Sequence, residues 1–305
     1  ILFKAFYNIY NDLITSINTK SSSLFNDRSF QKLINDKLFL NAMKKIIFQD
    51  IGLENILTKA RRELSNLISL NEEIQSKSYI EFIYSLAEQC FINEYIYSLN
   101  KDDYKNISII IERSKKQKAS EIDIAIIACY FPLHKLLDQL PSLKSVSSTN
   151  PNLQAIIRLQ ISEPLEEVLL SKKIKKIGSI KNEISRKVKS QYEENPYPRW
   201  KNVVLFDQLK VSPIQVINSE IKPNFIRSNL KSSNPIKVLI AGCGTGSQIL
   251  IAKRYKNAQI TAIDLSCSSL SYAKRKLNEL NISDVSLIQM DILEVSLLQT
   301  KFDII

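Results

Sequence analysis

The chain has 305 residues, of which 44% are hydrophobic, and this is enough for about two domains with a sizeable core. Its 42 Lys and Arg against 31 Asp and Glu give a net charge of +11, which suits an anionic partner such as nucleic acid. The 4 cysteines are scattered and only 1 histidine is present, so we expect neither a disulfide framework nor a metal site. These features favour a globular protein of a reducing compartment, the cytoplasm.

Residues 1–190 are predicted to form an all-α region. Apolar side chains recur at helical spacing over residues 33–47, 53–70 and 79–99, without an internal repeat period. The longest apolar run, residues 122–133, contains Asp123 and is shorter than the roughly 20 residues that cross a bilayer, so no membrane span is expected. His134 has no adjacent acid or cysteine and is interpreted as a structural side chain.

A basic stretch lies at the end of this region. Its cations are Lys172, Lys173, Lys175, Lys176, Lys181, Arg186, Lys187 and Lys189, with Glu183 as the one acid between them. A solvated helix face is the favoured interpretation in a chain so rich in lysine, and a nucleic-acid patch is the alternative.

Residues 191–235 are predicted to be a linker. They contain Pro196, Pro198, Pro213, Pro223 and Pro235. Proline removes a backbone donor and holds the preceding residue in an extended conformation, which favours a segment that runs over the surface. The linker would separate the helical region from a third segment, residues 236–305.

From residue 236 the pattern alternates between short apolar strands and helices. The predicted order is strand 237–241, helix 247–255, strand 259–263, helix 266–280, strand 285–290 and a strand from Phe302. Ser266 is a suitable N-cap for the second helix. Apolar strands of this kind are typical of parallel sheets covered by helices, so we expect an α/β fold with a Rossmann-like, doubly wound parallel sheet.

A glycine-rich turn follows the first of these strands. Gly242, Gly244 and Gly246 are three of the chain's 5 glycines, and a turn without side chains lets a ligand approach the backbone. Asp264 ends the next strand, where an acid that binds a ribose stands in nucleotide-binding folds. The dinucleotide fingerprint requires glycine where this chain has Ser247, which disfavours an NAD(P)-binding oxidoreductase but keeps it as an alternative.

Residues 238–246, with the sequence VLIAGCGTG, resemble the first motif of class I S-adenosylmethionine-dependent methyltransferases. Asp264 is similar to the ribose-binding acid of that family, and residues 290–292 are similar to its adenine-binding turn. The resemblance implies S-adenosyl-L-methionine as the cofactor, held by Gly242, Cys243, Gly244, Gly246, Asp264, Leu265, Asp291 and Ile292. Phe302 and the residues after it resemble the start of the fourth strand of the family.

Elementary chemistry agrees with these roles. Glycines leave room for the cofactor, and the carboxylate of Asp264 can accept hydrogen bonds from a ribose diol. Asp291 would accept from the adenine amine, while Leu265 would lie against the adenine ring. The family usually has an acid where this chain has Ile240, so the sequence does not show which residue holds the ammonium group of the cofactor.

Residues 89–95, 130–134, 163–167 and 191–200 are similar to a helical region of bacterial proteins that couple tetratricopeptide repeats to such a methyltransferase domain. The repeats themselves are not recognisable in this chain. Within the last segment Tyr192, Tyr197, Arg199 and Trp200 have two interpretations. They form a cover over the cofactor or the acceptor, because aromatic faces attract a sulfonium cation, or they pack the linker onto the sheet.

The predicted function is methyl transfer to an unidentified acceptor, which is a protein, RNA, a lipid or a small molecule. The helical region would bind a protein partner. A non-catalytic scaffold that binds protein or RNA is the alternative from another class. Because the chain begins at Ile1 rather than Met and stops at Ile305, we expect a fragment that is truncated at both ends, with its acceptor site and catalytic base beyond Ile305.

Overall fold

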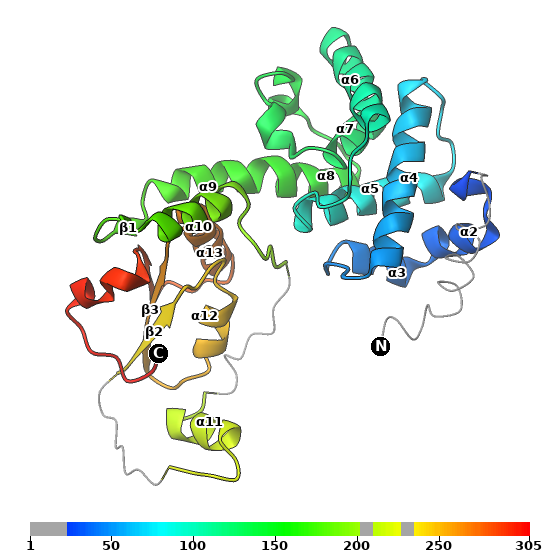
Figure 1. Ribbon diagram of the computed structural model, residues 1–305. Coiled ribbons are helices and arrows are strands. Elements are labelled where there is room, and N and C mark those ends of the chain that lie inside the picture. Colours follow the sequence, from blue (N-terminus) through cyan, green and yellow to red (C-terminus); the bar gives the residue numbers. More distant parts are fainter. Residues whose placement is uncertain (1–22, 202–209, 227–234) are drawn as a thin grey trace. The chain divides into compact units, whose positions relative to one another are not determined.

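The computed structural model describes residues 23–201, 210–226 and 235–305, and the chain divides into two compact units (Figure 1). The first unit ends at Pro164 and the second begins at Leu165. The predicted helical region extended to residue 190, so its last 26 residues, 165–190, belong to the sheet unit instead. The reason is that residues 175–176 of this segment pair with a strand of the sheet, and the helix that begins at Glu183 packs on a helix that covers the sheet.

The first unit is helical. Its elements are η1 (Leu24–Asn26), α2 (Arg28–Asn35), α3 (Lys37–Met43), α4 (Ile51–Ser69), α5 (Lys77–Ile92), α6 (Lys101–Lys116), α7 (Glu121–Ala128), η2 (Leu133–Leu136), η3 (Pro141–Ser145), α8 (Pro151–Ile157) and the π-helical turn η4 (Arg158–Ser162). The expected all-α region is confirmed up to this point. The helix α9 (Glu163–Ser171) follows and leads into the second unit.

Two of the predicted helical stretches are shorter in the structure. The periodic pattern of residues 33–47 is divided between α2 and α3, because the Asp36 side chain accepts from Leu38 N and Phe39 N and so starts a new helix. The stretch 79–99 ends as a helix at Ile92, after which Glu94 and Tyr95 adopt positive φ angles of 57° each. Apolar periodicity continues across both breaks, so it does not reveal them.

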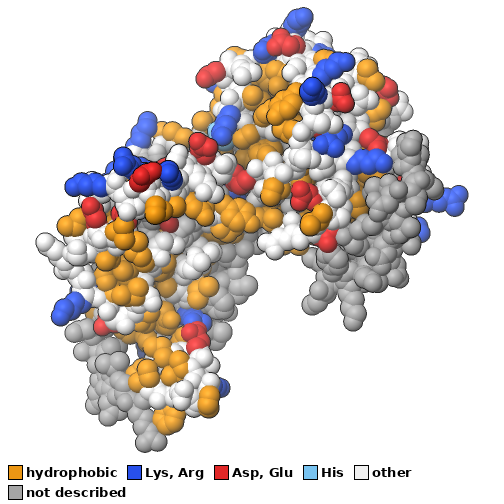
Figure 2. Space-filling model, viewed as in Figure 1, with side chains coloured by type: hydrophobic (Ala, Val, Ile, Leu, Met, Phe, Trp, Pro, Cys, Tyr) orange, Lys and Arg blue, Asp and Glu red, His pale blue; other side chains and the backbone are white. Residues whose placement is uncertain are grey.

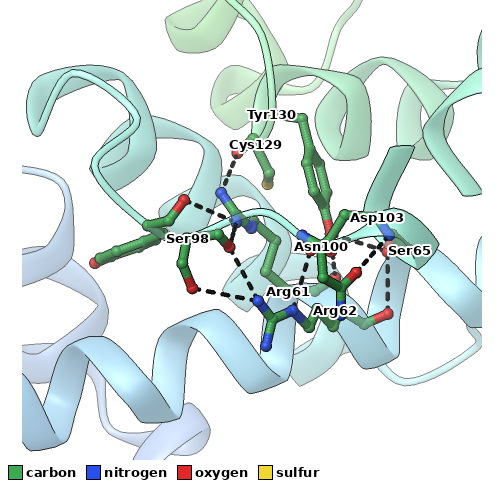
Figure 3. Close-up of polar contacts among 9 residues, drawn as sticks. Arg61, Arg62, Ser65, Ser98, Asn100, Asp103, Cys129 and Tyr130 are labelled. Atoms are coloured by element: carbon green, nitrogen blue, oxygen red, sulfur yellow. Dashed lines mark hydrogen bonds and ion pairs between the residues drawn. The ribbon is translucent and has the colours of Figure 1, made fainter. Parts of the chain in front are cut away.

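A fully buried cation lies in the core of the first unit (Figure 3). The Arg61 guanidinium on α4 donates to the carbonyl oxygens of Ser98 at 2.9 Å and Cys129 at 3.4 Å. It also lies 4.4 Å from the ring centroid of Tyr130, whose hydroxyl donates to Asp103 Oδ1 at 2.8 Å. Figure 3 shows this network joining α4, α6 and the residues after α7. Backbone oxygens and an aromatic face thus solvate a charge that water does not reach.

The second unit contains a four-stranded parallel sheet with the order β1-β4-β3-β2. Its strands are β1 (Lys175–Lys176), β2 (Ile236–Ala241), β3 (Ala258–Asp264) and β4 (Val285–Gln289). The predicted strands at 237–241, 259–263 and 285–290 are confirmed, whereas β1 was not predicted. At the other edge Ile304 bridges Val238 of β2, and Leu239 N donates to Ile304 O at 2.9 Å.

The chain therefore extends the sheet from β2 in both directions, first toward β3 and β4 and then to Ile304. This order confirms the expected α/β class with a doubly wound parallel sheet. In such sheets ligands bind at the carboxyl ends of the strands, at the point where the direction of winding changes. Here that point is the end of β2, directly before the glycine turn.

Helices α12 (Ser247–Ala252) and α13 (Cys267–Glu279) cover one face of the sheet (Figure 1). Ile249 of α12 and Leu270 of α13 pack with Val238 and Ile260 in one apolar cluster. On the other face a smaller cluster forms around Leu239, Ile263 and Ile288, with Leu298 of η5 (Ile292–Leu298) against it. The helix α10 (Glu183–Glu194) packs on α13.

The predicted linker, residues 191–235, has regular structure in its described part. The helix α11 (Pro213–Glu220) lies within it and begins with a capping box formed by Ser212 and Gln215. Residues 202–209 and 227–234 of this segment lie outside the described residues. Among the helices that the structure describes, none combines the length and the apolar character needed to cross a membrane.

Candidate functional site

The glycine turn after β2 has a backbone that only glycine adopts readily. Gly242 and Gly244 have φ angles of 73° and 51°. Gly242 N and Cys243 N both donate to Ile263 O, at 2.9 and 3.0 Å, which ties the turn to the end of β3. A Cβ atom placed on Gly242 would meet no atom within 4 Å, so this position faces open space. A ligand can approach the backbone closely there.

Gly246 has a different role from the other two glycines. A Cβ atom at this position would lie 2.8 Å from the Cβ of Ala273 on α13, and the φ angle is 89°. The residue is thus needed for close packing between the turn and α13. It does not line the cavity described next, and its predicted contact with the cofactor stays a prediction.

A cavity of about 400 Å³ lies at the carboxyl ends of β2, β3 and β4. Its walls come from α10, the proline-rich segment after it, the glycine turn, the end of β3 and the end of β4. The lining residues include Val188, Tyr192, Tyr197, Pro198, Gly242, Cys243, Gly244, Asp264, Leu265, Met290 and Ile292. Eight of the twelve predicted site residues are therefore brought together, although they lie up to 100 residues apart in the sequence. The volume is in the range of small-molecule and cofactor sites.

Asp264 is the acid in this cavity. Its Oδ2 accepts from Gly244 N and its Oδ1 accepts from Ser266 N, both at 2.8 Å. Burial raises the pKa of Asp264, the two backbone donors lower it, and the nearby charge of Glu193 raises it, with a net upward shift. Each carboxylate oxygen has two lone pairs, so the side chain retains acceptor capacity toward the cavity.

Cys243 also borders the cavity but is not a reactive group. Burial raises the pKa of its thiol, and the charge of Asp264 raises it further. The thiol therefore stays protonated and acts as a small apolar surface.

The turn after β4 is only partly as predicted. Ile292 is 52% exposed and lines the cavity, together with Met290. Asp291 is buried and does not line it, because its Oδ1 accepts from Leu293 N at 3.0 Å and caps η5. The side chain of Asp291 thus caps η5 in this structure, and its contact with adenine stays a prediction.

The aromatic segment 192–200 divides into two pairs. Tyr192 and Tyr197 line the cavity, in agreement with a cover, whereas Arg199 and Trp200 do not. Trp200 Nε1 donates to Thr245 O at 2.9 Å, and Tyr272 of α13 donates to Trp200 O at 2.6 Å. These two bonds fasten the segment to the glycine turn and to α13, which is the packing role that the sequence left open.

Arg199 takes part in a largely buried ion-pair network. Its guanidinium lies 3.8 Å from Glu167 of α9, which also accepts from Arg275 of α13 at 2.8 Å. Arg275 pairs in addition with Glu279 on the next turn of α13. The network holds α9, the aromatic segment and α13 together.

The sequence analysis missed Glu193. This residue of α10 accepts from Cys267 N and Ser268 N, each at 2.9 Å, and from Ser268 Oγ at 2.7 Å. Its partners lie 74 and 75 residues further along the chain, so no local pattern indicates the contact. The only available signal was the position of Glu193 directly after Tyr192 in the aromatic segment.

His134 lies in the first unit, where its Nδ1 is 3.2 Å from the carbonyl oxygen of Gln160. Gln160 itself is fully buried and its amide donates to Ala87 O and Ala128 O, both at 3.1 Å. The surroundings of His134 are thus a packed junction between helices, as its structural interpretation requires.

Comparison with known proteins gives one family. Residues 232–305 match the family described as Methyltransferase domain. The chain is also 38% identical over 92 residues to a malonyl-[acyl-carrier protein] O-methyltransferase of Priestia megaterium (strain DSM 319 / IMG 1521). This match covers 30% of this chain and 30% of the relative, so the chain spans less than a third of that protein in the alignment. No solved structure matches the chain.

The family match begins close to β2 and contains the glycine turn, Asp264 and the turn after β4. The α/β part of the chain is therefore similar in sequence to methyltransferase domains. The helical first unit lies outside the match, and its kinship with repeat-containing proteins stays a prediction.

Proposed function

We propose that this protein is an S-adenosyl-L-methionine-dependent methyltransferase and that the cavity at the ends of β2, β3 and β4 binds the methyl donor. The observation that carries the proposal is that the glycine turn and the half-buried Asp264 line one cavity, within the segment that matches a methyltransferase domain. The comparison supports methyl transfer, and the geometry supports the place of the donor.

The residues present fit this cofactor. Gly242 leaves space for it, since a Cβ there would project into the cavity without meeting another atom. Asp264 retains acceptor capacity for a ribose diol. Leu265 and Ile292 supply apolar surface for the adenine ring, while Tyr192 offers an aromatic face to a cation.

The bound cofactor would supply an activated methyl group on a sulfonium, which leaves as a neutral thioether. The contribution of the protein to such a displacement is mainly to position donor and acceptor and to exclude water. Tyr192 and Tyr197, which are 39% and 42% exposed, lie at the cavity wall and are placed to contact both the donor and an acceptor.

The relative from Priestia megaterium is named for malonyl-[acyl-carrier protein], and its name suggests an acceptor carried on a protein for this chain. The tyrosines of the cavity wall would lie beside such an acceptor.

Calorimetric titration with S-adenosylhomocysteine tests the proposal. The wild-type chain should bind, and Asp264→Ala should weaken binding roughly 100-fold because a charged acceptor for two hydroxyl donors is removed. Asp284→Ala, on the surface and paired with Lys253, serves as the control and should bind as the wild type does. Absence of binding by the wild type would reject the proposal.

Titration with NADH in the same experiment tests the alternative of a nicotinamide-dependent oxidoreductase. We expect no heat of binding, because Ser247 stands at the third glycine position of the dinucleotide fingerprint. Tighter binding of NADH than of S-adenosylhomocysteine would favour that alternative. Binding of neither compound would favour a non-catalytic scaffold.

A further inference from the structure

Glu193 of α10, which is half-buried, contacts the first turn of α13. Its two carboxylate oxygens accept from Cys267 N, Ser268 N and Ser268 Oγ at 2.7 to 2.9 Å. The amide of Gln289, at the end of β4, lies 3.5 Å from the same carboxylate. The free N–H groups at the start of a helix are a favourable place for a negative charge. In this molecule the charge comes from a separate helix.

The turn that precedes α13 carries two residues of the cavity wall, Asp264 and Leu265. Ser266, at the N-cap, donates its N–H to Asp264 Oδ1 at 2.8 Å and its hydroxyl to Tyr192 O at 2.9 Å. Gln289 Nε2 donates to Leu265 O at 2.8 Å. The turn is therefore bonded on one side to α10 and on the other to β4.

Asp264 and Tyr192 are consequently linked through a short chain of contacts. Glu193 fixes the start of α13, the N-cap Ser266 precedes it, and Ser266 bonds both to Asp264 and to the backbone of Tyr192. The cavity residues on α10 and those at the end of β3 are thus held in fixed positions relative to one another. Positions of this kind must be kept within about 0.5 Å for a site to work.

We propose that Glu193 is a positioning residue of the donor site, which sets the place of the Asp264 turn against Tyr192. The inference rests on the proposed function, because it assigns Glu193 to the donor cavity. It also extends the site beyond the segment that matches a methyltransferase domain, since α10 lies upstream of residue 232. One wall of the cavity is then supplied by α10, which extends into the predicted linker.

The charge of Glu193 should influence the pH dependence of donor binding. A residue that only caps α13 would not change this pH dependence. Glu193 is one of the causes that hold the pKa of Asp264 above its ordinary value, after burial. The other titratable side chains at the cavity are Cys243 of the glycine turn and the tyrosines at positions 192 and 197. A ribose diol binds the ionised carboxylate, so affinity is present above the pKa of Asp264 and is lost as the pH falls through it.

The experiment uses the whole chain with Glu193→Ala and Glu193→Gln, and calorimetric titration with S-adenosylhomocysteine. Glu193→Ala should weaken binding roughly 10-fold, because the charge-assisted hydrogen bonds from Cys267 N and Ser268 N at the start of α13 are lost. Glu193→Gln keeps the shape and removes the charge, so the pH at which affinity is half lost should move to lower values than in the wild type. Glu194→Ala changes the exposed neighbour and should leave both quantities unchanged.

Thermal melting of the same variants, followed by the fluorescence of Trp200, the chain's only tryptophan, separates folding from positioning. If the wild type binds and both Glu193 variants bind equally well at every pH, the inference is wrong and the proposed function stands. The inference is also wrong if the variants lose affinity only in proportion to a lower melting temperature, with no shift in the pH midpoint. If the wild type does not bind, the proposed function fails and the inference fails with it.

Discussion

At the scale of single residues, the three glycines of one turn serve two different purposes. Gly242 is open toward the cavity, while Gly246 is pressed against Ala273 of α13. Both have positive φ angles, so a side chain is strained at either position for the same backbone reason. What distinguishes them is the neighbour that a Cβ would meet, and this depends on a helix that lies later in the chain.

We predict different effects for alanine at these two positions, mainly on stability at Gly246 and on stability and binding at Gly242. Gly246→Ala should lower the free energy of unfolding by about 2–3 kcal/mol, because a close contact is added to the backbone strain. Gly242→Ala should cost about 1–2 kcal/mol from strain alone and weaken S-adenosylhomocysteine binding roughly 10-fold, since its Cβ enters the cavity.

Urea denaturation followed by Trp200 fluorescence, with calorimetric titration of the folded variants, measures both effects. Trp200 suits this purpose because it packs on Thr245 and Tyr272 in the second unit. Equal stability of the two variants would contradict the packing role given to Gly246.

At the scale of elements, buried polar side chains decide how helices of the first unit meet. Arg61 of α4 has no exposed surface and donates to backbone oxygens of Tyr97, Ser98 and Cys129. Asp103 of α6 accepts from Arg62 Nε at 3.0 Å and closes the capping box of its own helix. Networks of this kind specify one arrangement of helices, because each alternative would leave a buried group without a partner.

Tyr130 allows this network to be tested with little change in shape. Its hydroxyl contacts Asp103 Oδ1 at 2.8 Å and Ser65 Oγ at 2.9 Å. Tyr130→Phe should therefore lower the free energy of unfolding by about 1–2 kcal/mol, since a buried carboxylate loses a donor. Circular dichroism at a helix wavelength during urea denaturation measures the change.

Tyr104→Phe is the matched control, because this tyrosine of α6 is 55% exposed. It should change the free energy of unfolding by less than about 0.5 kcal/mol. If the two variants are equally stable, the buried hydroxyl does not contribute as described.

At the scale of the whole molecule, Lys and Arg side chains are spread over the surface, and one basic stretch lies at β1 and α10 (Figure 2). Figure 2 shows Lys and Arg side chains gathered over β1 and α10, where the basic stretch of residues 172–189 lies. The stretch is not uniformly cationic, since Lys187 pairs with Glu183 at 2.8 Å and Ile184 is 72% exposed between them. An exposed, solvated helix face is the interpretation that this mixture favours.

We accordingly expect weak binding of single-stranded RNA, without preference for this stretch. Fluorescence anisotropy at several salt concentrations should give the same affinity for Lys172→Gln/Lys173→Gln as for Lys101→Gln/Lys105→Gln in the first unit. A steep loss of affinity with salt that only the first pair reduces would contradict this and would support an RNA acceptor.

Much of the fold was readable from the sequence, because β2, β3, β4 and α13 are local patterns. Apolar runs of strand length gave the three strands, and helical spacing with Ser266 as N-cap gave α13 within one residue at each end. The glycine turn and Asp264 were found for the same reason, since each directly follows its strand. Helix ends within the first unit were not found, because apolar periodicity runs across Asp36 and past Ile92.

The sequence alone thus determined the class of fold and eight of the residues that line the cavity, since both depend on patterns of neighbouring side chains in the chain. Only the tertiary structure decided that β1 joins the sheet, that Gly246 and Asp291 serve packing and capping, and that Glu193 holds the start of α13. Each of these facts depends on a contact between segments far apart in the sequence, as in the bond of Glu193 to a helix 74 residues away. Such contacts leave no local pattern, because the energy that makes them arises only when the chain has folded.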